Sequence, residues 1–176
     1  MKKVLFVFAL LVVSVPQFLY ANGISEEKLY GEWVMPEKDG SSLTLELSTD
    51  GEYGMATLMQ PIKYVEGGIG AQYKLYMYVP IYWSLNGAQL DVQFVTHNFD
   101  TEIELVKYIG VTESQAENEY AYDFEQLEQA LINDFENNMA METNPRYVFK
   151  IVSVNSSAMV VNPRGSKMRK TFKRVK

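Results

Sequence analysis

The chain has 176 residues, a formal net charge of −6 and no cysteine. The negative charge argues against nucleic acid and anionic membrane surfaces as partners. The lack of cysteine excludes disulfides, thiolate metal sites and a cysteine nucleophile. A chain of this length suits one domain whose core is stable without cross-links.

The first 23 residues have the pattern of a secretory signal peptide. A pair of lysines precedes an apolar run over residues 4–15, and a small-residue end follows at Ala21 and Gly23. A membrane anchor would need about 20 mainly apolar residues, and Pro16 interrupts this run. We therefore expect residues 1–23 to be removed and residues 24–176 to form one exported domain, periplasmic or extracellular, without membrane insertion after cleavage.

The start of the domain predicts a short helical turn followed by paired strands. Residues 25–29 fit one helical turn, and residues 31–35 fit a first strand. Leucines alternate with polar residues over residues 43–47, as in a half-buried strand. Asp50–Gly51 is a hairpin signal, so residues 52–59 are expected to return beside that strand.

Residues 73–83 form the most apolar predicted strand. Its odd-numbered side chains are all apolar and are expected to face the core, because successive side chains of a strand point to opposite faces. The even-numbered set includes Tyr76, Tyr78 and Tyr82 and is expected to be partly covered or to lie at a rim. Pro80 has no backbone donor, which predicts an edge position or a bend.

Two more strands and one helix follow. Residues 88–94 and 102–105 alternate as half-buried strands do, and Asn86–Gly87 predicts a hairpin before them. The period then changes, with an amphipathic helix predicted from Asp123 as N-cap until Asn144–Pro145 ends it. Its apolar stripe comprises Phe124, Leu127, Leu131, Phe135 and Met139.

Three strands are expected to end the chain, at residues 147–151, 159–161 and 168–174. The pattern is therefore eight to ten short antiparallel strands with hairpin signals between most neighbours, plus one amphipathic helix before the last strands. This pattern predicts a mainly β fold, an antiparallel up-and-down β-barrel.

A Gly-x-Trp motif at Gly31 and Trp33 lies on the first predicted strand, and Arg174 lies on the last. With these residues the chain resembles the lipocalins and the lipocalin-like, calycin-type exported domains of bacteria. The resemblance implies that Gly31, Trp33 and Arg174 close one end of the barrel, with the guanidinium packed across the indole. Such a cation–π contact contributes roughly 0.5–2 kcal/mol.

The residues that could carry catalysis form no recognisable set. His97 is the only histidine and is expected to be a turn residue, because a zinc site without cysteine would need it together with carboxylates. Asp91, Glu102 and Glu104 fall on the polar faces of predicted strands and are expected to be solvated. The glycine-rich segment 66–70 lacks the context of a phosphate-binding loop and is expected to be a flexible loop. We expect no enzyme activity, no cofactor and no metal site.

Charge is unevenly distributed along the chain. Residues 113–142 hold nine acids and no base, whereas residues 164–176 hold seven bases and no acid. The favoured interpretation is a solvated helix face and a strand edge protected by bases. The alternative is two opposed binding patches.

Two functions remain open from the sequence. In the first, the barrel binds a small hydrophobic ligand in its lumen. The candidate lining residues are Leu75, Met77, Val79, Ile81, Leu90, Val92, Phe94 and Phe149. In the alternative, a solid-core structural or interaction module docks a protein partner through its tyrosine-rich face or its basic C-terminus.

Overall fold

The computed structural model describes residues 24–49, 52–140 and 144–175, with the side chains of residues 139 and 140 excepted. The predicted signal peptide and the Asp50–Gly51 hairpin lie outside this part of the chain. The elements are η1 (Glu26–Lys28), β1 (Gly31–Pro36), β2 (Ser42–Leu47), β3 (Tyr53–Glu66), β4 (Ile69–Asn86), β5 (Gln89–Phe94), β6 (Asp100–Ile109), α1 (Glu113–Glu119), α2 (Ala121–Ala140), β7 (Arg146–Val154), β8 (Ala158–Pro163) and β9 (Lys170–Arg174).

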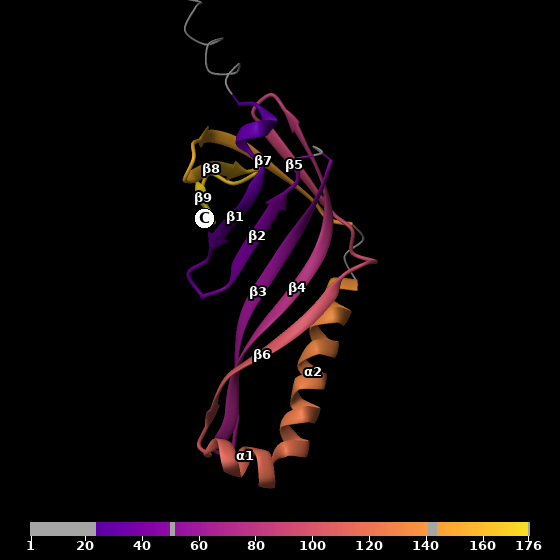
Figure 1. Ribbon diagram of the computed structural model, residues 1–176, viewed down its shortest axis with the longest axis vertical. Coiled ribbons are helices and arrows are strands. Elements are labelled where there is room, and N and C mark those ends of the chain that lie inside the picture. Colours follow the sequence, from indigo (N-terminus) through magenta and orange to yellow (C-terminus); the bar gives the residue numbers. More distant parts are fainter. Residues whose placement is uncertain (1–23, 50–51, 141–143, 176) are drawn as a thin grey trace, which may run out of the picture.

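Eight of the nine described strands close into an antiparallel barrel (Figure 1). Their order is β3-β2-β1-β9-β8-β7-β5-β4, and pairing of β3 with β4 completes the ring. Strands that follow one another in sequence are neighbours in the ring, except that β5 pairs with β7, because β6 lies outside the ring, and that β1 pairs with β9. The predicted mainly β, up-and-down barrel is confirmed.

The alternation of the sequence decides which side chains enter the core. On β4 every odd-numbered residue from Ala71 to Trp83 is buried, while the even-numbered residues between them are partly or largely exposed. Large aromatic side chains fill the barrel, among them Trp33, Phe149 and Phe172. The rings of Phe149 and Phe172 meet edge to face with centroids 5.8 Å apart, a favoured geometry for aromatic pairs.

β3 and β4 continue beyond the barrel as one long hairpin. Their pairing runs to Glu66 and Ile69, and the turn between them consists of Gly67 and Gly68, with φ angles of 58° and 87°. The predicted flexible loop at residues 66–70 is therefore wrong. Two positive φ angles match the turn to the twist of the flanking strands, and glycine adopts them without steric cost.

Pro80 lies inside β4, which has neighbours on both sides, so the predicted edge position is also wrong. On one side β4 pairs with β6 as far as Tyr78 and with β5 from Ile81 onward. Pro80 occupies the gap between these two ladders, where the missing N–H removes no bond to either strand. Its carbonyl instead accepts a hydrogen bond from the backbone N–H of Val95 at 2.9 Å.

β6 pairs with β4 outside the ring, which gives a three-stranded extension of β3, β4 and β6. The helices α1 and α2 lie along this extension, and α2 runs back toward the barrel (Figure 1). We call the unit formed by residues 60–75 and 100–140 the arm. Its own small core joins Ala71 and Tyr73 of β4 to Ala116 and Phe124 of the helices.

The helical segment is longer than predicted and is divided into two helices. Thr112 caps α1, and its side chain and that of Gln115 form a reciprocal capping box. Asp123 consequently lies in the first turn of α2 and is not an N-cap. The predicted stripe is confirmed for Phe124, Leu127 and Leu131, which pack in the small core of the arm.

Two residues of the predicted C-terminal strands are more exposed than expected. Met168 lies in the loop between β8 and β9 and exposes 68% of its surface, because β9 begins at Lys170. Tyr147 shares the face of Phe149 and Ile151 but lies near the start of β7 and is 46% exposed. Phe149 and Ile151, the other two residues of that face, are buried, as predicted.

Candidate functional site

The eight predicted lumen residues are all buried, with exposed fractions between 0% and 4%. Seven of them belong to one cluster of contacting side chains, while Leu75 lies opposite Gln60, one residue beyond the pairing of β2 with β3. An eight-stranded ring can be filled by side chains or can hold one small ligand, and a lumen with room for a ligand would leave part of its wall accessible. Among the described residues, protein side chains occupy this interior.

The closed end of the barrel has the arrangement that Gly31, Trp33 and Arg174 predict. The guanidinium carbon of Arg174 lies 4.2 Å from the centre of the Trp33 ring. Gly31 has a φ of 113°, and a Cβ there would lie 3.0 Å from Nη1 of Arg174. Glycine is therefore favoured by the backbone conformation, and any larger residue would also have to displace the guanidinium slightly.

The outer face of β3 and β4 carries exposed and half-exposed tyrosines that we call the tyrosine band: Tyr53, Tyr76, Tyr78 and Tyr82. Tyr53 and Tyr82 are register partners with ring centroids 5.1 Å apart, and they expose 53% and 48% of their surfaces. Tyr76 and Tyr78 stack with centroids 6.4 Å apart. The band thus follows the outer face of the barrel along β4 as far as the start of the arm.

Carboxylates of β6 border the band, and we call Asp100, Glu102 and Glu104 the acidic rim. The hydroxyl of Tyr76 donates to Glu104 at 2.8 Å, and that of Tyr78 donates to Glu102 at 3.0 Å. Lys74 also bonds to Glu104, with Nζ and Oε1 separated by 3.1 Å. These contacts hold the tyrosine rings in one orientation on the surface.

The same hydrogen bonds shift the acidities of their partners. Hydrogen bonds from Tyr76 and then Lys74 lower the pKa of Glu104 below its usual value. The bond to Glu104 raises the pKa of Tyr76, and burial followed by the bond to Glu102 raises that of Tyr78. At neutral pH Glu104 is therefore anionic, and Tyr76 and Tyr78 are neutral donors.

The two charge runs lie apart in the fold. Figure 1 shows α1 and α2, which hold most of the acidic run, beside the arm, and β9, which holds part of the basic run, next to β8 at the other end of the molecule. Part of the basic run has structural partners, because Lys170 forms an ion pair with Glu37 and Arg174 covers Trp33. The basic C-terminus therefore offers fewer uncommitted charges than the sequence suggests.

Two further candidate residues, His97 and Asp91, lie in a turn and in an ion pair. His97 is exposed in the turn between β5 and β6, as predicted. Asp91, predicted to be solvated, is 8% exposed instead, because Arg146 and Gln89 cover it with hydrogen bonds at 3.0 Å. Within residues 24–49, 52–140 and 144–175, no group of three or more histidine, aspartate or glutamate side chains is placed to hold a metal ion.

Sequence reasoning identified Tyr76, Tyr78 and Tyr82 but not their partners. Tyr53 comes from another strand, and Glu102 and Glu104 are more than 20 residues further along the chain. The sequence signal for the rim is the row of acids on one parity of β6. The position of these acids relative to the tyrosines is defined only by the pairing of β6 with β4.

No protein-family model, curated protein or solved structure matches this chain. Among the described residues, no helix has both the length and the apolar character that crossing a membrane requires.

Proposed function

We propose that this protein is an exported, non-enzymatic, lipocalin-like barrel with a solid core, and that it docks a partner protein through the tyrosine band. The observation that carries the proposal is the band itself, a row of oriented aromatic rings on an open sheet face. The contact of Trp33 with Arg174 at the closed end supports the lipocalin-like kinship.

The burial of the predicted lumen residues supports the interaction module over the ligand carrier. Their exposed fractions of 0–4% leave almost no wall surface for a small molecule to contact. Binding inside the barrel would require displacement of well-packed aromatic and aliphatic side chains, which costs several kcal/mol for each cavity of side-chain size. The outer tyrosines are already accessible.

The tyrosine band has the chemistry of a protein interface. Tyrosine is enriched in such interfaces because a large apolar ring and a polar hydroxyl act together. The hydrogen bonds of Tyr76 and Tyr78 to the acidic rim fix both rings before any partner arrives. Pre-organised side chains lose less conformational entropy on binding, so more of the contact energy appears as affinity.

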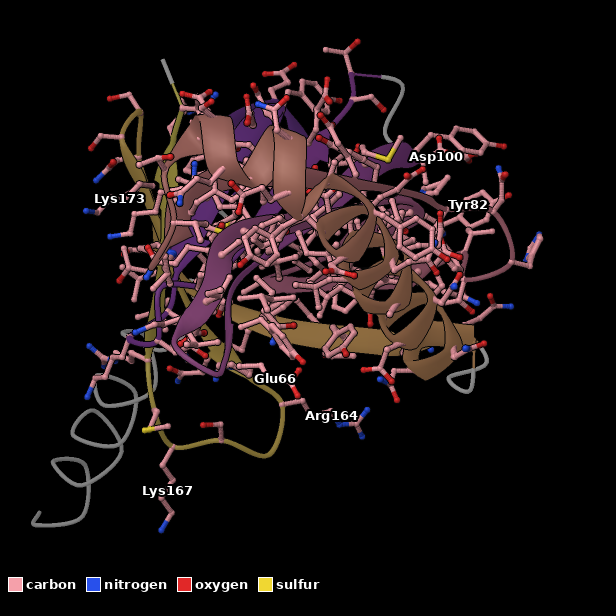
Figure 2. The ribbon with its side chains drawn as sticks, turned by 90° about the horizontal axis from the view of Figure 1, so that it is seen from below. Glu66, Tyr82, Asp100, Arg164, Lys167 and Lys173 are labelled. Atoms are coloured by element: carbon pink, nitrogen blue, oxygen red, sulfur yellow. The ribbon has the colours of Figure 1, made fainter. Side chains whose placement is uncertain are left out.

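The charges beside the band define the partner. The acidic rim fits a partner surface that presents arginine or lysine side chains among apolar ones, since carboxylates pair with guanidinium groups and tyrosine rings attract cations. Lys74 pairs with Glu104, so Asp100 and Glu102 carry most of the attraction of the rim for a basic partner, and Lys173 lies across the molecule (Figure 2). The proposed partner is therefore an exported protein with a basic, partly apolar docking surface.

The test is photo-cross-linking in the exported fraction of the native host. A photoreactive phenylalanine analogue at Tyr82 should yield a cross-linked partner, and the same analogue at Tyr122, which is 71% exposed on α2, should not. The identified protein is then purified, and its affinity is measured against the wild type and the double variant Tyr76→Ser with Tyr78→Ser. We expect at least a tenfold loss of affinity in that variant.

A matched control is Tyr122→Ser, which should bind as the wild type does. The proposal fails if both positions cross-link equally or if the double variant retains full affinity while remaining folded. Native mass spectrometry of the protein from its own host addresses the alternative. A retained small hydrophobic molecule would favour the lumen hypothesis over docking.

A further inference from the structure

A groove of about 520 Å³ lies between the β3–β4 hairpin and α2, on the helix side of the arm. The hairpin contributes Tyr64 and Ile69, and α2 contributes Phe124 and Leu127. Because Tyr64 pairs with Ala71 in the register, its side chain belongs to the sheet face that α2 covers. The groove thus lies on the face opposite Tyr76 and Tyr78.

The walls of the groove are mainly apolar and aromatic. Phe124 is 7% exposed and packs against the ring of Tyr108, with centroids 4.9 Å apart. Leu127 and Ile69 are half-buried, and Tyr64 remains 39% exposed beside the opening. The volume falls within the usual range of roughly 300–1,000 Å³ for small-molecule sites, which are lined mostly by such side chains.

The polar groups of the groove carry negative charge. Its lining contains the carboxylates of Glu66 and Asp123, and none of its lining residues is lysine or arginine. The nearest lysines in the sheet, Lys63 and Lys107, both lie opposite Gln72 in the register. Gln72 alternates with Ala71 along β4, so these lysines belong to the other face.

The pKa of Tyr108, on the same side of the arm, agrees with a negative potential there. Burial, followed by the charges of Glu128 and Glu117, raises the pKa of the Tyr108 hydroxyl. One carboxylate of the groove is also fixed in place, since the hydroxyl of Tyr64 donates to Oε2 of Glu66 at 2.6 Å. A fixed acceptor beside an aromatic ring is a suitable environment for a cation.

We propose that this groove binds a small organic cation, an ammonium or guanidinium group carried on an aromatic or alkyl body. The body lies against Phe124 and Leu127, and the cationic head lies between Glu66 and Asp123. Both carboxylates accept hydrogen bonds from the head, and the rings of Tyr64 and Tyr120 add cation–π attraction. The site lies on the other face of the arm from the tyrosine band, so it is independent of the proposed docking function.

The test compares three probes that share one apolar body: 3-phenylpropylammonium, 3-phenylpropan-1-ol and 3-phenylpropanoate. Binding to the purified domain is followed by two-dimensional amide NMR, which also reports the position of the site. We expect the cation to shift amide signals of β3, β4 and α2 around the groove. It should bind about tenfold more tightly than the alcohol, and the carboxylate should not bind.

Variants assign the binding to the groove. Asp123→Asn and Glu66→Gln should each weaken the cation about tenfold and leave the alcohol unchanged. Ala130→Phe places a ring at the lining and should abolish binding of both. Glu46→Gln, which removes an exposed acid of β2 outside the lining, is the matched control and should have no effect.

Thermal melting by circular dichroism establishes that each variant is folded. Equal affinity for all three probes, shifts confined to other parts of the molecule, or no binding of the cation up to its solubility limit would each overturn the proposal. Full affinity in folded Asp123→Asn and Glu66→Gln variants would do the same.

Discussion

Arg174 covers Trp33 and joins three elements at the closed end of the barrel. Its guanidinium carbon lies 4.2 Å from the centre of the indole, and its nitrogens donate to the carbonyls of Tyr30 and Lys28 at 2.7 Å each. The residue thereby links β9 to β1, to η1 and to the residues that follow η1. β1 and β9 share two register pairs, Trp33 with Arg174 and Val34 with Lys173, so these side-chain contacts reinforce a short ladder.

Trp33→Ala should lower the free energy of unfolding by about 3–5 kcal/mol, because the indole is fully buried and its loss leaves a large cavity. Its Nε1 also donates to the carbonyl of Leu29 at 2.6 Å, which holds η1 over the barrel end. Urea denaturation followed by circular dichroism measures the change. A loss below about 1 kcal/mol would contradict the assigned position of the indole.

Arg174→Met should cost about 1–3 kcal/mol, because it keeps an apolar cover over Trp33 but removes the cation and both hydrogen bonds. Lys173→Met is the matched control on the same strand, since Lys173 is exposed and should be nearly neutral. Parallel urea titrations compare the two. Equal effects would mean that the guanidinium contributes nothing beyond its aliphatic part.

Tyr73→Phe should raise the free energy of unfolding by about 1 kcal/mol, because the hydroxyl is buried without a hydrogen-bond partner among the described residues. Burial, and next the nearby carboxylate of Glu128, raises the pKa of this hydroxyl, but no bond of normal hydrogen-bond geometry joins the two groups. Tyr122→Phe at an exposed site serves as control. Destabilisation in the thermal melt of Tyr73→Phe would show that the hydroxyl has a partner after all.

Two ion pairs of the sheet should differ in their contribution to stability. Asp91→Ala should cost about 2 kcal/mol, since the carboxylate is buried and accepts bonds from Arg146 and Gln89. Glu104→Gln should cost clearly less, because its pair with Lys74 is exposed and solvent screens it. Denaturation of both variants by guanidinium chloride tests which loss of stability is larger. A larger loss for Glu104→Gln would contradict the burial assigned to Asp91.

The stability of the fold should decline at high pH because the pKa values of Tyr73, Tyr76 and Tyr78 are raised in the folded state. Unfolded tyrosine ionises near about pH 10. Raised folded pKa values therefore contribute stability that is complete below that pH and is lost as pH rises through the folded values. Tyrosinate absorbance should appear at higher pH in the folded protein than in denaturant, and coincident titrations would contradict this.

The alternation of apolar and polar residues along the chain determined which segments form barrel strands and which of their faces points inward. Strict period-two burial on β4, the Asn86–Gly87 turn and the apolar parity of β5, β8 and β9 are local patterns, and each specifies a strand and its inward face without reference to the rest of the chain. The apolar stripe of α2 was visible for the same reason, since it depends on helical spacing alone. The contact between Trp33 and Arg174 was expected from a family resemblance and not from local periodicity, and the guanidinium does lie over the indole.

Only the tertiary structure decided where the ladders begin and end. Whether Gly67 and Gly68 form a loop or a tight turn depends on how far β3 and β4 continue to pair, which is a property of two strands together. The departure of β6 from the ring likewise creates the acidic rim beside the tyrosines and leaves the groove under α2. Contacts between residues far apart in sequence have no local periodicity, so both candidate sites became visible only once the strands were placed side by side.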